Sequence, residues 1–186
     1  MNRNAAPLLG TLAEIWDILD AHVLGAGPQR PYVTFATTDT ANRPRLRAVA
    51  MRSADRARAE LQLYTDLRSH KVGEIQCNAN VSVLIWRPDI AVQLRVSGTA
   101  AIASGAAVAG KWQALTAEGR LNYSHQPPPG TPIGQPDGFE QAPSRDNFAV
   151  LTVSVAHIDY VSLADTGHSR AEFSADDNWQ GRWLSP

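Results

Sequence analysis

The chain has 186 residues, of which 44% are hydrophobic and 19% are charged, and its formal net charge is −1. This length and composition suit one globular domain with a sizeable core, and they argue against a disordered chain and against a globally basic nucleic-acid binder. Cys77 is the single cysteine, which excludes an internal disulfide framework, and no apolar run is long enough to suggest a membrane span. We therefore expect a single domain over residues 1–186, with no visible signal peptide and in a reducing, cytoplasmic setting.

The first regular apolar pattern predicts an N-terminal helix. Apolar residues at positions 8, 12, 15, 16, 19 and 23 follow helical spacing, and the glycines and proline at 25–28 end it, so residues 1–28 form the helical region. Two strands are expected next, at Tyr32–Thr38 and Arg45–Arg52, joined by a turn at Asp39–Asn42. A third strand is expected at Leu61–Thr65.

A change of period then predicts a short helix. Ser69 is the expected N-cap, Val72 and Ile75 follow at helical spacing, and the pattern ends at Asn78. We expect Cys77, in this helix, to be a small buried residue. Strands follow at Val81–Trp86 and Ala91–Ser97, and then a helix from about Ser104 to Gly119.

Residues 124–145 hold half of the twelve prolines, and they predict a long ordered loop, or lid, because strands resume beyond them. The later strands are expected at Phe148–Val155, Ile158–Leu163, Ser169–Phe173 and Gly181–Leu184. Strands dominate, and closing such a sheet removes its exposed edges. The pattern therefore predicts a mainly β protein, an antiparallel β-barrel with peripheral helices, although the order of the strands does not follow from it.

The basic residues are unevenly chosen and placed. Two of the 17, Lys71 and Lys111, are lysines and the others are arginines, several of which cluster around the second strand. On a regular strand, Arg43, Arg45 and Arg47 share one face and Arg52 lies on the other, whereas a bulge would bring Arg47 and Arg52 to one ligand. A solvated arginine face is the alternative interpretation.

The segment Tyr64–Lys71 leads from a strand through a turn into the start of a helix. Free backbone N–H groups at a helix start favour an anion, and two basic side chains in the first turn oppose the helix dipole unless an anion is bound. Ser69, His70 and Lys71 therefore predict a phosphate cradle, with an ordinary capped helix as the alternative. The histidines show no metal-ligand spacing, so no metal site is expected.

Two motifs resemble the pyridoxamine 5′-phosphate oxidase family of split-barrel flavoproteins: Arg47-Ala-Val-Ala-Met-Arg52 and Tyr64-Thr-Asp-Leu-Arg-Ser-His-Lys71. Later segments agree in order, namely Gln93-Leu-Arg-Val-Ser-Gly98, Gly167-His168-Ser-Arg170 and the C-terminal Trp179–Pro186. The resemblance covers roughly residues 32–186. It implies a split β-barrel of six antiparallel strands of Greek-key type, FMN as the cofactor, and a homodimer with FMN at the subunit interface.

The resemblance also implies roles for individual residues. Arg47 and Lys71 match positions that hold the FMN phosphate, and Ser69 and His70 complete that cradle, although the family commonly has arginine where His70 stands. The flavin is expected to be lined by Ala48, Val49, Ala50, Met51, Arg52, Tyr64 and Thr65. Gln93 matches a glutamine that reaches FMN from the partner subunit. Arg170 matches a flavin-facing arginine, and His168 matches a position on the substrate side.

Two departures bear on the reaction. Arg52 stands where the oxidases carry a lysine that contacts flavin and substrate phosphate, and Thr166 stands where they carry a further substrate-binding arginine. These differences argue against pyridoxamine phosphate oxidase activity itself. The resemblance implies an FMN-dependent oxidoreductase that transfers a hydride between a small molecule and FMN, with Arg52 and His168 as candidate catalytic residues. The alternative is a module that binds or stores flavin, haem or a deazaflavin without turnover; no nucleic-acid or membrane partner is expected.

Overall fold

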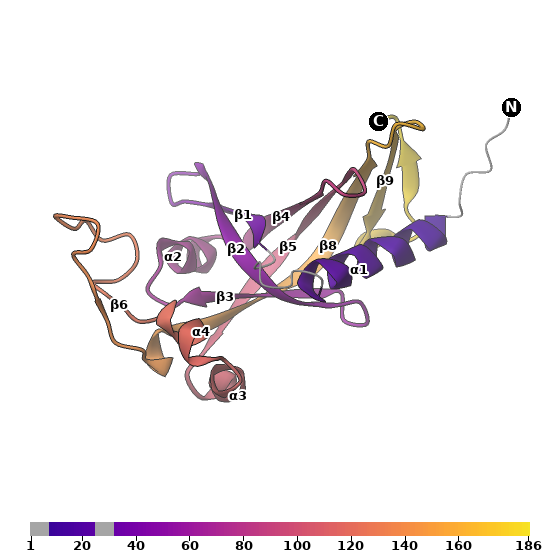
Figure 1. Cartoon of the computed structure of the whole chain (residues 1–186). Helices are drawn as coiled ribbons and strands as arrows, with labels where there is room; N and C mark the ends of the chain where they lie inside the picture. The colour runs from indigo at the N-terminus through magenta and orange to yellow at the C-terminus, as the bar shows by residue number, and fades with distance from the viewer. Residues whose placement is uncertain (1–7, 25–31) are drawn as a thin grey trace, which may run out of the picture.

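The computed structural model describes residues 8–24 and 32–186 (Figure 1). Its first half holds the N-terminal helix, five strands and a short helix: α1 (Leu8–Leu24), β1 (Tyr32–Thr38), β2 (Pro44–Asp55), β3 (Glu60–Asp66), α2 (His70–Cys77), β4 (Asn80–Arg87) and β5 (Val92–Ser104). Its second half holds two short helices and five strands: α3 (Ala109–Gln113), α4 (Ala117–Leu121), β6 (His125–Gln126), β7 (Glu140–Gln141), β8 (Phe148–Ser162), β9 (Ser169–Ser174) and β10 (Arg182–Leu184). Single 3-10 turns precede α3, β8 and β10.

Six antiparallel strands close into a barrel. Their order is β8-β3-β2-β1-β4-β5, and β5 pairs with β8 to complete the ring. Because β4 returns beside β1 after the β1-β2-β3 meander, the order is that of a Greek key. The predicted mainly β class and the six-stranded split barrel are therefore confirmed. Strands β9 and β10 extend the sheet from β8, away from α2 (Figure 1).

The core fills the barrel and continues onto α1. Phe35, Leu63, Leu94 and Leu151 from four different strands are fully buried, and the apolar face of α1 packs against the same cluster. The predicted helix at the N-terminus is thus confirmed, although its expected ending at 25–28 lies outside the described residues. None of the described helices is both long and apolar enough to cross a membrane.

A second, smaller cluster lies under α3 and α4. Phe148 makes edge contacts with Tyr64 and Tyr123, with ring centroids 5.1 and 4.9 Å apart, and Trp112 packs against the same ring. Val108 and Val150 complete this aromatic cluster. The cluster fixes the end of β3 against the loop that follows α4, which places two tyrosines beside the start of α2.

Several expected boundaries were wrong. The helix expected from Ser104 to Gly119 is broken, because Thr116 starts a new helix by accepting a hydrogen bond from Gly119 N at 3.0 Å. The two strands expected at Phe148–Val155 and Ile158–Leu163 form one continuous strand, β8. Cys77 is exposed rather than buried, since α2 turns only Val72, Glu74 and Ile75 inward.

Candidate functional site

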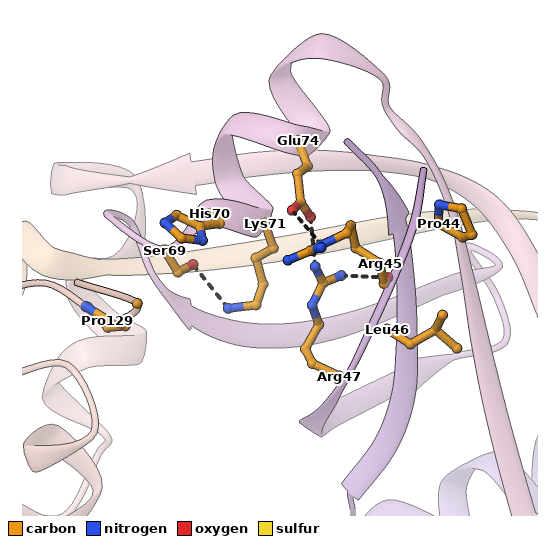
Figure 2. Close-up of a pocket in the computed structure, with 10 residues that line it drawn as sticks. Pro44, Arg45, Leu46, Arg47, Ser69, His70, Lys71, Glu74 and Pro129 are labelled. Carbon is orange, nitrogen blue, oxygen red and sulfur yellow. Dashed lines mark hydrogen bonds and ion pairs between the residues drawn. The ribbon is translucent and has the colours of Figure 1, made fainter. Parts of the chain in front are cut away.

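A cavity of about 430 Å³ lies between β2, the first turn of α2 and the loop 124–142, here called the lid (Figure 2). We call it the cradle cavity. It is lined by Pro44, Arg45, Leu46, Arg47, Ser69, His70, Lys71, Glu74, Pro129 and Gly130. The predicted phosphate residues Arg47, Ser69, His70 and Lys71 are thus brought together.

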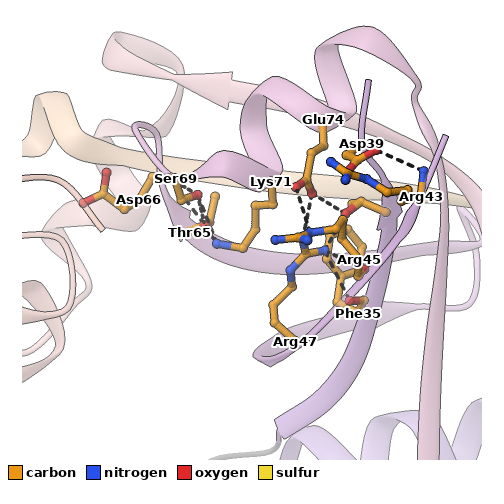
Figure 3. A network of polar contacts seen from close by, with 11 residues as sticks. Phe35, Asp39, Arg43, Arg45, Arg47, Thr65, Asp66, Ser69, Lys71 and Glu74 are labelled. Carbon is orange, nitrogen blue, oxygen red and sulfur yellow. Dashed lines mark hydrogen bonds and ion pairs between the residues drawn. The ribbon is translucent and has the colours of Figure 1, made fainter. Parts of the chain in front are cut away.

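Ser69 occupies the N-cap position of α2 but its side chain does not cap the described helix. Its hydroxyl instead donates to Asp66 O at 2.7 Å and accepts from Lys71 Nζ at 3.0 Å, and Lys71 Nζ also donates to Thr65 Oγ1 at 3.0 Å (Figure 3). Burial lowers the pKa of Lys71, and the positive charge of Arg47 lowers it further. The charges of Asp66 and Glu74 act in the opposite direction but do not outweigh these effects. The ammonium is therefore half-buried with two neutral hydrogen-bond partners, an arrangement that an anion would stabilise.

Glu74 fixes the arginines of β2. Its carboxylate accepts from Arg47 Nη2 at 2.7 Å and from the Thr37 hydroxyl, and lies 3.9 Å from Arg45 Nε (Figure 3). Burial acts to raise the pKa of Glu74, but the hydrogen bonds from Thr37 and Arg47 and the arginine charges outweigh it, so this pKa lies below its ordinary value. One carboxylate thus faces two guanidinium groups, and with Lys71 the cavity wall stays net positive.

A second cavity, of about 260 Å³, shares the walls Ser69, Lys71 and Pro129 with the cradle cavity. We call it the strand cavity. It is lined by Tyr32, Ala48, Val49, Ala50, Arg52, Tyr64, Thr65, Asp66, Ser69, Lys71, Asn122, Tyr123 and Pro129. Most of the residues expected to line a flavin therefore meet in one place, next to the phosphate cradle.

Arg52 lines the strand cavity at a point where β2 is irregular. The pairing of β2 with β3 shifts register between Met51 and Ser53, at Arg52. The Arg52 guanidinium carbon lies 5.4 Å from the centroid of the Tyr64 ring, and Arg52 Nε is buried with no hydrogen-bond partner among the described residues. A buried, unpaired donor of a charged group is costly, and Arg52 brings its positive charge to the wall of the strand cavity.

Four predicted site residues do not line these cavities. Met51 is fully buried in the barrel core, so its side chain does not reach them. Gln93 and Arg170 both stand opposite Val161 of β8, and His168 is exposed just before β9. These last three residues belong to the arm made by the far ends of β5, β8 and β9, at the opposite end of the barrel from α2 (Figure 1).

Arg170 has a defined partner on that arm. Its guanidinium donates to Asp159 Oδ1 at 3.1 Å and to Oδ2 at 2.8 Å, and Arg95 pairs with the same carboxylate. Burial acts to raise the pKa of Asp159, but these arginines outweigh it and the pKa lies below its ordinary value. Two guanidinium groups on one carboxylate leave this patch with net positive charge.

Sequence reasoning missed Glu74, Asp159 and the lid residue Pro129. Glu74 had a usable signal, since it lies three residues after Lys71 and so on the same helix face. Asp159 and Pro129 had none, because their partners are far away in the chain. Within the described ranges, no group of three or more His, Cys, Asp or Glu side chains is placed to hold a metal ion.

Comparison with known families and structures gives a consistent result. A family model described as the FMN-binding domain of pyridoxamine 5′-phosphate oxidase matches residues 14–104, from within α1 to the end of β5. That range contains every lining residue contributed by β2, β3 and α2 to the two cavities.

Solved structures share the fold. A pyridoxamine 5′-phosphate oxidase-related, FMN-binding protein from Nostoc punctiforme is 23% identical with a TM-score of 0.73, over 99% of this chain and 100% of that one. PhzG from Burkholderia lata, solved with tetrahydrophenazine-1-carboxylic acid, is 19% identical with a TM-score of 0.74, over 98% of this chain and 95% of that one. At these identities the likeness is one of fold.

Proposed function

This chain belongs, over residues 14–104, to the pyridoxamine 5′-phosphate oxidase FMN-binding domain family, and from this premise we propose that it is an FMN-dependent oxidoreductase acting on a small molecule. When bound, FMN supplies the hydride chemistry, and the protein binds and orients it. The observation that carries the proposal is the adjacency of two cavities that share the walls Ser69, Lys71 and Pro129 and that are lined by basic groups, Arg47 and Lys71 in one and Lys71 and Arg52 in the other.

The cradle cavity fits the phosphate end of FMN. Arg47 and Lys71 supply positive charge, Ser69 supplies a hydroxyl, and backbone N–H groups at the start of α2 point outward. Glu74 holds the Arg47 guanidinium in place while leaving the wall net positive. These residues would hold the phosphate, with His70 at the exposed rim.

The strand cavity fits the ring end. Ala48 and Ala50 present small apolar side chains, whereas the Val49 side chain belongs to the barrel core, and Tyr64 lies beneath the Arg52 guanidinium. Arg52 lines this cavity, so its guanidinium would donate to an acceptor on the ring or on the substrate. Its positive charge would also favour negative charge that develops near it during reduction.

A homodimer completes this proposal. Gln93 and Arg170 flank Val161 on the two sides of β8, at the other end of the barrel from α2, so one chain cannot bring them and its own cradle to the same ligand (Figure 1). A two-fold partner can, because it offers the same arm to the first chain's cavities. Exposed Trp86 and Trp183, from β4 and β10, are apolar surface for such a contact. His168 of the arm would then lie on the substrate side.

The test is anaerobic reduction of the FMN-loaded protein by NADH and NADPH, followed by air. We expect the flavin absorbance to bleach faster than that of free FMN with the same reductant and to return when oxygen is admitted. Dithionite serves as the control that the bound flavin can be reduced at all. A flavin that dithionite bleaches but neither nicotinamide reduces would require another small reductant as donor.

The competing assignment is a module that stores flavin without turnover. It would be favoured if the bound flavin resisted every small-molecule reductant tried while dithionite still bleached it. A protein that takes up no FMN would contradict both assignments.

A further inference from the structure

The lid is a loop whose two ends are held together by hydrogen bonds. Its base is fastened by the pairing of β6 with β7 and by a hydrogen bond from Ala142 N to Ser124 O at 2.9 Å. Arg68, held by Asp66, donates to His125 O at 2.9 Å and so ties the start of the lid to the cradle. The cavity inside the lid is therefore preformed.

That cavity, here called the lid cavity, measures about 370 Å³, within the range of small-molecule sites of about 300–1,000 Å³. It is lined by Asn122, His125, Pro127, Pro128, Pro129, Gly130, Thr131, Ile133 and Phe139. The rings of His125 and Phe139 lie 4.8 Å apart, and three consecutive prolines make a rigid apolar wall. Its lining contains no lysine, arginine, aspartate or glutamate, unlike the cradle cavity.

The lid cavity adjoins the proposed cofactor site. It shares Asn122 and Pro129 with the strand cavity, and Pro129 and Gly130 with the cradle cavity. Gly130 has φ of 93°, and a Cβ built on it would lie 2.9 Å from His70 Cε1, so the lid backbone passes directly against the cradle. A molecule in the lid cavity therefore lies next to the strand cavity, with Asn122 and Pro129 between the two.

We propose that the lid cavity binds a flat, uncharged aromatic or heteroaromatic ring, and that this ring belongs to the small molecule presented to FMN; the proposal rests on the function proposed above. Flat apolar walls favour a planar ring over a saturated one. Asn122, Thr131 and His125 offer hydrogen bonds to one or two polar atoms on the ring. With no ionised partner in the lining, a charged ring substituent would be left unpaired there, so it is disfavoured.

The test measures binding of naphthol to the FMN-loaded protein by calorimetry, with no reductant present. Two related probes separate the features of the ring: decahydronaphthol has the same skeleton but is not flat, and naphthoate is flat but charged. We expect naphthol to bind at least about tenfold more tightly than either.

Two lid variants locate the site. Ile133→Ala and Phe139→Ala are each expected to weaken naphthol binding by about tenfold, since each removes several apolar carbons from the wall. Ile90→Ala is the matched control, because Ile90 is 42% exposed and Ile133 43%, but Ile90 lies in the β4–β5 turn. FMN content and thermal unfolding should be unchanged in all three variants, which shows that they fold.

Equal naphthol affinity in wild type and both lid variants, or equal binding of the three probes, would overturn the lid assignment. Because no reductant is present, this outcome is independent of turnover. Lid-dependent naphthol binding in a protein whose flavin no small molecule reduces would leave the lid site standing and remove the proposed oxidoreductase function.

Discussion

Lys71 is a half-buried ammonium whose two hydrogen-bond partners are the hydroxyls of Thr65 and Ser69. Burial and the nearby Arg47 lower its pKa, so the free protein carries this charge at a cost. A phosphate in the cradle cavity would stabilise the Lys71 ammonium more strongly than those neutral hydroxyls do. The same logic applies to Arg52, whose buried Nε has no partner in the described chain.

This cost has a pH signature in FMN affinity. Bound phosphate favours the ammonium, so the pKa of Lys71 is lower in the free protein than in the complex, and between the two values binding takes up a proton. FMN affinity should therefore fall with rising alkaline pH, by up to about tenfold per unit. Titrations across that range should show a flatter curve for Lys71→Arg, which stays charged. A Lys71→Arg curve as steep as that of the wild type would contradict this role.

The sequence predicted Ser69 and Lys71 as site residues, because the helix cap and the basic residues of the first helical turn are adjacent in the chain. It gave Ser69 a capping role that the structure replaces, since its hydroxyl serves Asp66 and Lys71 instead. The Arg47–Glu74 pair joins a strand to a helix across 27 positions. Such partners depend on how β2 and α2 meet, which local patterns do not determine.

The elements that position the site are shaped by two irregularities in strand pairing. The register of β2 against β3 shifts at Arg52, and the register of β5 against β8 shifts between Ser97 and Gly98. Arg52 stands at the first shift, beside the strand cavity, and the second lies in the long β5–β8 pair that carries the arm. Neither shift is visible in the hydrophobic alternation. From the sequence, the only reason to consider a bulge in this strand is that a bulge would bring Arg47 and Arg52 to one ligand.

Gly98 is required by its close contact with β8. A Cβ at this position would lie 2.0 Å from Ser154 O, a backbone atom that cannot move without disturbing the barrel. Gly98→Ala is therefore expected to destabilise the fold by about 3 kcal/mol or more. Urea unfolding measures this, with Gly73→Ala as the control, since a Cβ on Gly73 meets nothing within 4 Å and alanine favours helix α2. Equal stability of the two variants would contradict this account of the β5–β8 contact.

The lid depends on one anchored arginine. Arg68 forms a two-point pair with Asp66 and also holds His125 O, so Arg68→Ala should speed amide hydrogen exchange in residues 125–141 by about tenfold. Arg87→Ala is the control: Arg87 makes a similar two-point pair with Asp89, and the two arginine side chains are 23% and 22% exposed. Unchanged exchange of the lid in Arg68→Ala would show that β6–β7 pairing alone holds it.

Element positions were largely predictable and their ends were not. The strand alternation located β1 to β5, because half-buried strands alternate apolar and polar residues. It placed the end of β5 seven residues early, since the alanine-rich run up to Ser104 carries little alternation of its own and is held by pairing with β8. The break at Thr116 depends on a cap that competes with helix continuation.

The whole molecule has its basic cradle at one end of the barrel and a second positive patch at the other. Asp159 holds Arg95 and Arg170 on the arm, far from α2 (Figure 1). Strand order was not derivable from periodicity and came from the resemblance, because closure of β5 on β8 is a long-range event. The homodimer remains a prediction that this separation motivates.

A mixing experiment tests that prediction. Lys71→Met removes a charge from the cradle of its own chain. Arg170→Ala removes a charge from the arm, which in the proposed dimer contributes to the site of the partner chain. Each variant alone should bind FMN weakly, whereas subunits dissociated and reassociated together should recover about a quarter of the sites, because half of the dimers are mixed and each has one intact site. No recovery on mixing would contradict shared sites.

The central claim is that the cradle cavity binds the phosphate of FMN, and its most direct test compares FMN with riboflavin, which has the same ring and no phosphate. Fluorescence titrations use the wild type, Lys71→Met and Lys111→Met; Lys111 is the other lysine and bonds Gln62 instead. Wild type and Lys111→Met should prefer FMN by at least about a hundredfold, and Lys71→Met should lose at least about tenfold of that preference. Equal affinity of the wild type for FMN and riboflavin would contradict the account.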